Sequence, residues 1–213
     1  MPLQPIVLAA GASRRLGRPK ALVELEDGRT VLAAVLECLA EALPDAPAPV
    51  VVAGAHAATI LPEAERCGAT PLEHAGWERG RLSSLQAAVE HCAPGSGSSP
   101  STPDLLVWPV DRPGCLAADL VAMLDAWNRR DATGPGWMSP RAPSGRHGHP
   151  ILLGAGLVPA LRALGPDASL RELRAQAAWL DAVPVSHSGT ELDLDHPEDV
   201  EAVRAWFRSH GAG

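Results

Sequence analysis

The sequence predicts a three-layer α/β domain, in which helices cover both faces of a mostly parallel sheet. Short apolar runs at residues 5–10, 49–53 and 105–110 are typical of strands that are buried on both faces. Helical stretches separate these runs, and this alternation implies right-handed strand–helix–strand crossovers. The chain has 213 residues, of which 46% are hydrophobic, so it can bury one compact core.

The first half of the chain alternates regularly between the two kinds of element. Thr30 can cap a helix that runs to about Leu43 and carries its leucines and valines on one face. After the second strand, we expect a helical stretch to Arg66 and a short strand near Thr70. A further helix is predicted over residues 81–92, which carry an apolar stripe.

The second half contains two segments with a loop-like composition. Residues 94–103 are rich in Ser, Gly and Pro, which predicts a flexible surface loop rather than a domain boundary. Residues 131–149 are rich in Gly, Pro, Arg and His, and we interpret them as a functional loop region. The other elements expected here are helices at 116–130, 156–164 and 169–179, strands at 151–153, 182–186 and 191–194, and a closing helix from Pro197.

Composition narrows the class of protein. The net charge of −7 argues against nonspecific binding to nucleic acid, which needs a basic face. No window approaches 18 uninterrupted apolar residues, and the N-terminus does not resemble a secretory signal, so we expect a cytoplasmic protein with no membrane span. The four cysteines form no CxxC pair and are interpreted as buried, reduced thiols: Cys38, Cys67, Cys92 and Cys115.

Basic residues concentrate in the loop after the first predicted strand. Lys20 is the only lysine, and Arg14, Arg15 and Arg18 precede it within seven positions of a chain that has 18 basic residues. Ligands of open α/β sheets bind at the carboxyl ends of the strands, and Gly11 lets the backbone turn its N–H groups toward an anion. The loop therefore suits a polyphosphate, although it is neither a Walker loop nor GxGxxG. The alternative is an arginine-rich surface turn.

Carboxylates follow later predicted strands. Asp111 ends a buried strand between two prolines, where it can hold Mg²⁺ or cap the next turn. Asp193 and Asp195 are alternate residues of a predicted strand and should point the same way, so their charges repel unless a cation lies between them. The alternative is that Asp195 or His196 caps the helix that follows.

Two weaker features lie elsewhere. The helix start at Gly80–Leu85 offers hydroxyl and free N–H groups that can bind a nucleotide or only cap the helix. His147 and His149 form a His-x-His pair, but zinc needs further ligands and the other histidines are scattered.

Residues 8–20 resemble the N-terminal signature of the molybdenum cofactor nucleotidyltransferase-like (MobA/MocA-like NTP transferase) family. That signature reads Leu-Ala-Ala-Gly-x-Ser-x-Arg-x-Gly with a following Lys, and Ser13, Arg15, Gly17 and Lys20 fall on its positions. The resemblance continues in order along nearly the whole chain, at Gly80–Leu85, Pro109–Pro113, Gly148–Pro150 and Asp193–Asp199.

This resemblance implies a Rossmann-like nucleotidyltransferase fold with a mostly parallel mixed sheet. One NTP-transferase domain would span residues 1–213, with a nucleotide-binding half at about 1–115 and an acceptor-binding half at about 116–213. Such a protein binds an NTP with Mg²⁺, transfers the nucleotidyl group to a phosphate acceptor such as molybdopterin, releases pyrophosphate and has a molybdoenzyme as a further partner. The Ala-Ala-Gly of the signature is more similar to the cytidylyltransferase branch, which uses CTP, than to the guanylyltransferase branch.

Two departures from the family pattern concern the acceptor. The Pro-Val-Asp-Arg-Pro element at 109–113 replaces a commoner Ala-Asp-Gln-Pro, and Gly165-Pro166-Asp167 replaces a Gly-Asp-x-Gly.

The resemblance also implies roles for individual residues. Arg15 and Lys20 would neutralise the phosphates and the leaving pyrophosphate, and Asp111 would join them as a catalytic residue. The metal would be bound by Asp111, Asp193 and Asp195. His149 and Pro150 would border the acceptor. The other nucleotide contacts would come from Leu8, Ala9, Ala10, Gly11, Ser13, Ser83 and Ser84.

Other readings of the same motifs stay open. A sugar-1-phosphate nucleotidyltransferase or a guanylyltransferase shares the chemistry. A glycosyltransferase would use Asp193-Leu194-Asp195 to hold a nucleotide-sugar through metal, but it would leave the basic loop without a purpose. A protein of another class would bind a nucleotide or finished cofactor without turnover.

Overall fold

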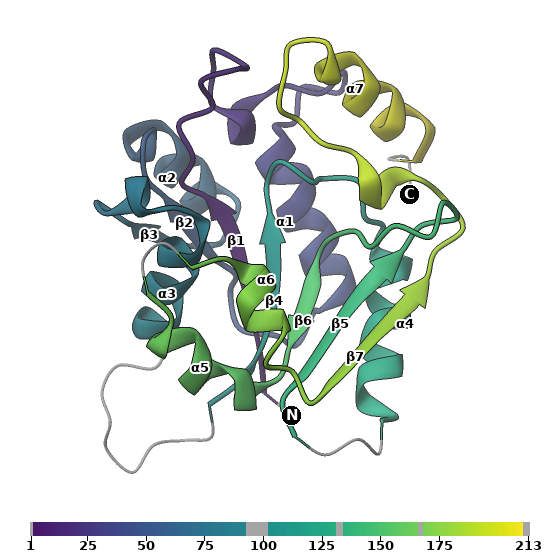
Figure 1. The fold of residues 1–213 in the computed structure, drawn as a ribbon. Helices are drawn as coiled ribbons and strands as arrows, with labels where there is room; N and C mark the ends of the chain where they lie inside the picture. The colour runs from purple at the N-terminus through teal and green to yellow at the C-terminus, as the bar shows by residue number, and fades with distance from the viewer. Residues whose placement is uncertain (1, 93–101, 131–133, 166–167, 211–213) are drawn as a thin grey trace.

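The computed structural model describes residues 2–92, 102–130, 134–165 and 168–210. Within these ranges, seven strands form one sheet in the order β3-β2-β1-β4-β6-β5-β7 (Figure 1). Only β6 runs antiparallel to its neighbours, so the predicted mostly parallel α/β architecture is confirmed. The strands are β1 (Leu3–Ala9), β2 (Val50–Ala53), β3 (Thr70–Glu73), β4 (Asp104–Pro109), β5 (Gly136–Arg141), β6 (Ile151–Leu153) and β7 (Trp179–Pro184).

Helices cover both faces of the sheet and create two cores. One core lies under α1 (Val31–Ala42), α2 (Ala57–Arg66), α4 (Ala117–Asn128) and α7 (Asp199–His210). The other lies under α3 (Arg81–Cys92), α5 (Val158–Ala163) and α6 (Leu170–Arg174), and α6 crosses in front of the sheet in Figure 1.

The central strand shows why the sheet needs continuous apolar runs. Ile6 and Leu8 of β1 pack into the core under α3, whereas Val7 and Ala9 pack into the core under α1. Alternate side chains of a strand point to opposite faces. A strand with helices on both sides must therefore be apolar at every position.

The N-terminal cap of α1 is the one that the sequence predicted. The Thr30 hydroxyl accepts a hydrogen bond from the backbone N–H of Ala33 at 3.0 Å, which satisfies one of the unpaired donors at the start of α1.

Three predictions of local structure were wrong. Residues 131–149 are not all loop, because β5 lies within them. Its buried Trp137 and Met138 anchor it to both cores. No strand forms at 191–194, since a short 3-10 turn (Gly189–Glu191) ends there and Leu194 instead donates its N–H to the Asp111 carbonyl at 2.9 Å. The helix expected at 169–179 stops after five residues, at the end of α6, and the chain extends into β7.

The remaining expectations have mixed outcomes. The four cysteines are free thiols, but only Cys115 is buried as predicted, and the other three are half-buried. No helix in the described parts of the chain has the length and apolar character that crossing a membrane requires. Most of the loop predicted at 94–103, as well as Pro166 and Asp167, lies outside the described residues.

Candidate active site

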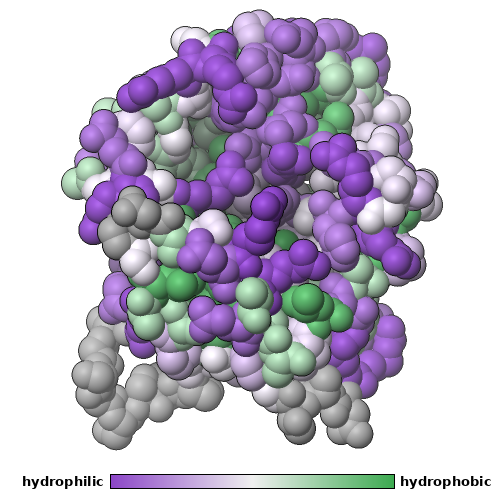
Figure 2. All heavy atoms as spheres, viewed as in Figure 1, coloured by the Kyte–Doolittle hydropathy of each residue, from purple (hydrophilic) through white to green (hydrophobic). Residues whose placement is uncertain are grey.

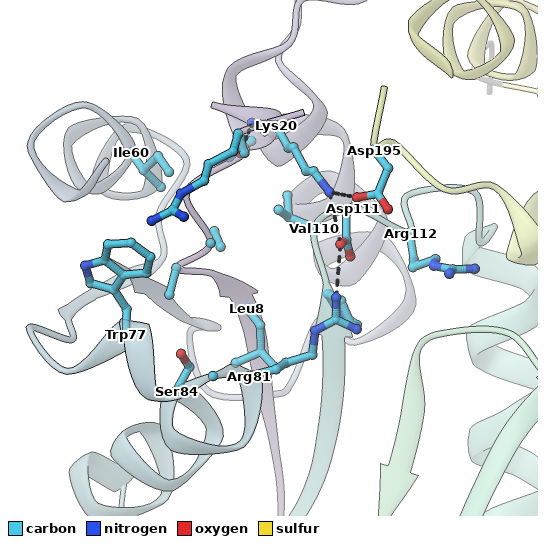
Figure 3. A pocket seen from close by; sticks show the side chains of 18 of the residues that line it. Leu8, Lys20, Ile60, Trp77, Arg81, Ser84, Val110, Asp111, Arg112 and Asp195 are labelled. Atoms are coloured by element: carbon cyan, nitrogen blue, oxygen red, sulfur yellow. Dashed lines mark hydrogen bonds and ion pairs between the residues drawn. The ribbon is translucent and has the colours of Figure 1, made fainter. Parts of the chain in front are cut away.

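A cavity of about 600 Å³ opens at the carboxyl ends of β1 and β4 (Figure 3). This is the edge at which open α/β sheets bind their ligands. The loop after β1, the start of α3, the turn after β4 and the segment before α7 all contribute to its walls. The lining residues are Leu8, Ala9, Ala10, Gly11, Ser13, Arg14, Arg15, Lys20, Ala21, Ile60, Trp77, Glu78, Gly80, Arg81, Ser84, Pro109, Val110, Asp111, Arg112, Asp193 and Asp195.

The loop after β1 folds back on itself and brings Lys20 into the cavity. Ser13 adopts a left-handed backbone conformation with φ 51°. Its carbonyl accepts from the N–H of Gly17 at 3.0 Å, and its hydroxyl accepts from the N–H of Lys20 at 3.2 Å. Buried Leu16 anchors the loop to the core. The loop thus has a defined shape, which favours the predicted anion-binding loop over the alternative of an arginine-rich surface turn.

Three carboxylates meet on the opposite wall. Asp111, Asp193 and Asp195 each offer one oxygen, and these oxygens all lie within 4.8 Å of one another. The hydrogen bond from Leu194 to Asp111 joins the two segments, so the residues on either side of Leu194 reach the same cavity without a strand. Asp199 supports this arrangement because its Oδ2 accepts from the N–H of Asp195 at 2.9 Å.

Cations from the basic loop contact these carboxylates. Lys20 Nζ lies 3.3 Å from Asp111 Oδ2 and also contacts Asp195 Oδ1. Arg15 Nη2 lies 2.6 Å from Asp195 Oδ2. The lone lysine therefore bridges two segments separated by more than 80 residues, as the dashed lines in Figure 3 show.

Two further arginines, to which the sequence analysis gave no role, complete the charge pattern. Arg81 at the start of α3 places Nη2 3.2 Å from Asp111 Oδ2. Arg112 places Nη2 2.6 Å from Asp193 Oδ2. Their motifs were noticed, but nothing in the sequence showed that the side chains turn toward these carboxylates.

The carboxylates differ in their electrostatic environment. Burial raises the pKa of Asp193, and the nearby charge of Arg112 only partly opposes this. Burial acts in the same direction on Asp195, but the hydrogen bond and charge of Lys20 and the charge of Arg15 outweigh it and lower the pKa. Oδ1 of Asp111 is buried and has no hydrogen-bond partner, so an acceptor atom in the cavity wall is left for a ligand.

An apolar wall faces the charged one. Ile60 and Trp77 lie on this side of the cavity in Figure 3. Gly54 makes room for the indole, because a Cβ at that position would lie 2.4 Å from Trp77 Cβ and 2.8 Å from the Ala10 carbonyl oxygen. Trp77 was not among the predicted site residues, although an indole between Gly76 and Gly80, just before a helix start, was a usable signal.

The two serines that were predicted to contact the nucleotide lie in different places. Ser84 lines the cavity, whereas Ser83 is buried behind it. The Ser83 hydroxyl donates to the Gly80 carbonyl at 2.8 Å and lies 3.0 Å from Nε2 of His74. Ser83 therefore supports the turn before α3 and does not face the cavity.

His149 and Pro150 lie beside the cavity and are not among its lining residues. Burial, together with the charges of Arg112 and Arg81, lowers the pKa of His149 to about 4, so the imidazole is neutral at pH 7. Its Nδ1 is buried without a hydrogen-bond partner. Apart from Ser83, His149 and Pro150, every residue for which the sequence predicted a site role lines the cavity.

The comparisons with known proteins agree with this geometry. The sequence pattern of the MobA-like NTP transferase domain matches residues 5–183. The chain belongs to this family. A curated relative of the chain, the nicotine blue oxidoreductase of Paenarthrobacter nicotinovorans, is 32% identical over 205 residues, which are 92% of this chain and 93% of the relative.

Solved structures match over nearly the whole length of this MobA-like chain. A homolog of Rv0371c from Mycobacterium sp. strain JC1 is 29% identical, with a TM-score of 0.74 and coverage of 97% of this chain and 98% of that one. A nucleotidyl transferase from Methanothermobacter thermautotrophicus is 20% identical, with a TM-score of 0.75 and the same coverage. Family and fold together identify the chain as a nucleotidyltransferase.

Proposed function

We propose that this MobA-like protein is a Mg²⁺-dependent enzyme of the cytoplasm that transfers the nucleotidyl group of an NTP, with CTP favoured, to a phosphate group of a molybdopterin-type acceptor. One observation carries the proposal: Lys20 and Arg15 meet three carboxylates in one cavity at the carboxyl edge of the sheet. Both signs of charge are needed to hold a metal–nucleotide complex.

The basic loop would bind the phosphates. Gly11 and Ser13 offer backbone N–H groups, and Arg15 and Lys20 would turn toward the β- and γ-phosphates and the leaving pyrophosphate. Such contacts accelerate the reaction when they strengthen as charge develops. The apolar wall at Trp77 supports binding of the base, because a base can stack on an indole.

The carboxylates suit a divalent cation. Oxygen ligands from Asp111, Asp193 and Asp195 match the preference of Mg²⁺, and the unpartnered Asp111 Oδ1 supplies an acceptor that nothing else in the described structure uses. Bound there, Mg²⁺ would neutralise charge on the nucleotide phosphates. Lys20 and Arg15 balance part of the negative charge of Asp111 and Asp195, so these two carboxylates can lie close together.

The residues of the chain then have to position the phosphate of the acceptor against the α-phosphate of the nucleotide. A phosphate oxygen of the acceptor attacks the α-phosphorus, the bond between that phosphorus and the bridging oxygen breaks, and pyrophosphate leaves. Arg112, with neutral His149 beside it, lies on the side from which the acceptor would approach. Positioning and charge neutralisation supply the rate, and no covalent intermediate is needed.

Thermal unfolding with CTP, GTP, UTP and ATP, each with and without Mg²⁺, tests the proposal. A ligand at 100 times its dissociation constant should stabilise the protein by about 2.7 kcal/mol. We expect a Mg²⁺-dependent rise in the thermal midpoint that is largest for CTP, as the Ala9-Ala10-Gly11 sequence suggests. In a separate assay, adding molybdopterin to the protein with CTP and Mg²⁺ should release pyrophosphate. A larger shift with GTP or UTP would contradict the base preference, and no shift with any nucleotide would contradict the whole proposal.

The relative from Paenarthrobacter nicotinovorans is an oxidoreductase by name, and this favours one second candidate function, that of an oxidoreductase. A nicotinamide dinucleotide is the cofactor to test, because its phosphates would lie against the basic loop and its rings against the apolar wall. Mixing the protein with NADH or NADPH and candidate dyes separates the two functions. Oxidation of the nicotinamide without pyrophosphate release from any NTP would favour this candidate.

A further inference from the structure

Arg141 and Arg174, on the acceptor side of the sheet, are unpaired in the part of the chain that the structure describes. Arg141 ends β5 and Arg174 ends α6, and among the described residues neither side chain forms a hydrogen bond or an ion pair. Nε of Arg174 is even buried without an acceptor. A protein of net charge −7 has more carboxylates than basic groups, and Arg130 and Arg146 do pair with carboxylates. The two unpaired guanidinium groups therefore lack an anion.

The fold places both arginines on the same side of the sheet. Trp137 of β5 packs into the core under α3, α5 and α6. Arg141, four residues later in the same strand, points to that face because side chains alternate. Leu173 is buried in the same core, and Arg174 follows it directly. In Figure 2 hydrophilic side chains gather over the middle of this face, where Figure 1 shows α6.

His147 adds a third donor. It forms an isolated β-bridge with Arg141, and its Nδ1 lies 2.8 Å from the Ser139 hydroxyl. Burial, with the charges of Arg174 and Arg141, lowers the pKa of His147, so the ring is neutral at pH 7. When the Ser139 hydroxyl donates to Nδ1, the proton of the neutral ring is on Nε2, where it can be donated to a ligand.

This cluster lies on the same edge of the sheet as the cavity. β5 runs parallel to β4, with antiparallel β6 between them, so both strands end at that edge. Two strand spacings separate them by about 10 Å. The segment from His147 to His149 leads from one region to the other, because His149 is close to the charges of Arg112 and Arg81.

We propose that Arg141, Arg174 and His147 form a second anion subsite, which binds a second anionic group of the acceptor, separate from the attacking phosphate, about 10 Å along the sheet edge from the reacting centre. Two guanidinium groups and an imidazole N–H match the donors that a tetrahedral phosphate requires. This inference rests on the proposed nucleotidyl transfer. It specifies the acceptor as a molecule with two anionic groups, of which one attacks the nucleotide and the other is held here.

Inorganic phosphate is the probe for this subsite. The full chain is first saturated with Mg²⁺ and a non-hydrolysable CTP analogue, so that the nucleotide site is filled. Phosphate is then titrated while calorimetry measures its affinity and NMR follows the imidazole signals of His147. We expect one binding event that moves the His147 signals, and about tenfold weaker binding in Arg141→Gln and in Arg174→Gln.

Arg171→Gln is the matched control, because Arg171 lies on the same helix, is exposed and forms no ion pair in the described structure. It should bind phosphate as the wild type does. Equal affinity in all three variants would overturn the inference, and so would acetate binding as tightly as phosphate. The nucleotide analogue serves as an internal check. If it does not bind the wild type, the proposed function fails; if it binds all variants and phosphate is insensitive to them, only the subsite fails.

Discussion

The carboxyl ends of β4 and β5 differ in how their positive charges are balanced. At the end of β4, four cations contact carboxylates: Lys20, Arg15, Arg81 and Arg112 contact Asp111, Asp193 or Asp195. At the end of β5, Arg141 and Arg174 contact none within the described structure. Paired charges suit a ligand that carries both signs, such as a metal–nucleotide complex, whereas unpaired arginines suit an anion alone. Side chains of the same type thus point to different ligands.

The largest expected effect comes from removing the carboxylate that joins the paired region. Asp111→Asn keeps the shape of the side chain, but it replaces the negative charge that Lys20 and Arg81 share with a neutral amide and should weaken metal binding. We expect pyrophosphate release to fall by about 10³-fold. Asp125→Asn near the end of α4 is the control, because this carboxylate is exposed and does not line the cavity, and it should keep the wild-type rate. A rate for Asp111→Asn within tenfold of the wild type would contradict the assignment.

Lys20→Ala should have the next largest effect. Removing the ammonium that neutralises leaving-group charge should lower turnover by about 10²-fold, with little change in the thermal midpoint. Arg18→Ala is the control. It removes a positive charge from the same loop at a position that does not line the cavity, so it shows whether the effect needs contact with the ligand or only positive charge nearby. Single-turnover rates with saturating CTP and Mg²⁺ give the comparison, and an unchanged rate would remove Lys20 from the mechanism.

Gly54→Ala tests the apolar wall of the cavity, which Ile60 and Trp77 form. Its new methyl group would meet Trp77 and the Ala10 carbonyl, so we expect a loss of about 3 kcal/mol in the free energy of unfolding and weaker CTP binding. Gly165→Ala, where a Cβ meets nothing within 4 Å, is the control. Urea unfolding measures stability, and fluorescence titration measures CTP affinity. A wild-type free energy of unfolding and a wild-type CTP affinity would contradict this prediction, because they would show that Trp77 moves away from the added methyl group at no cost.

The smallest effect concerns His149, which lies between the two regions. Its pKa is about 4 in the folded protein and about 6.5 in the unfolded chain. Between these values the unfolded state binds more protons, so stability should rise with pH, by about 2 kcal/mol from pH 5 to pH 7 for this group. In His149→Asn, urea unfolding at the two pH values should show a smaller difference. His91→Asn, at an exposed position of α3, should keep the wild-type difference.

Much of the fold could be read from local sequence. Continuous apolar runs identified β1, β2 and β4, because only a strand covered on both faces needs every side chain to be apolar. Thr30 identified the start of α1. The basic loop around Lys20 stood out because its composition differs from the rest of an acidic chain.

The tertiary structure decided how distant residues meet. Asp193 and Asp195 reach Asp111 through a backbone hydrogen bond from Leu194, and not through the strand that their spacing predicted. The composition of residues 131–149 concealed β5, since its Gly136 and Pro140 are typical of loops. Gly136 instead gives the room that the Trp179 ring of β7 needs.

The sequence by itself determined the order of strands and helices from β1 to α4 and the basic loop after β1, because these depend on neighbours within a few positions. Only the tertiary structure decided that Ser84 and not Ser83 faces the cavity, that Trp77 forms a wall, and that Arg141 and Arg174 share one face. Those outcomes depend on how α3 and α6 pack against the sheet. Packing is a property of surfaces brought together from distant parts of the chain, and no local pattern encodes it.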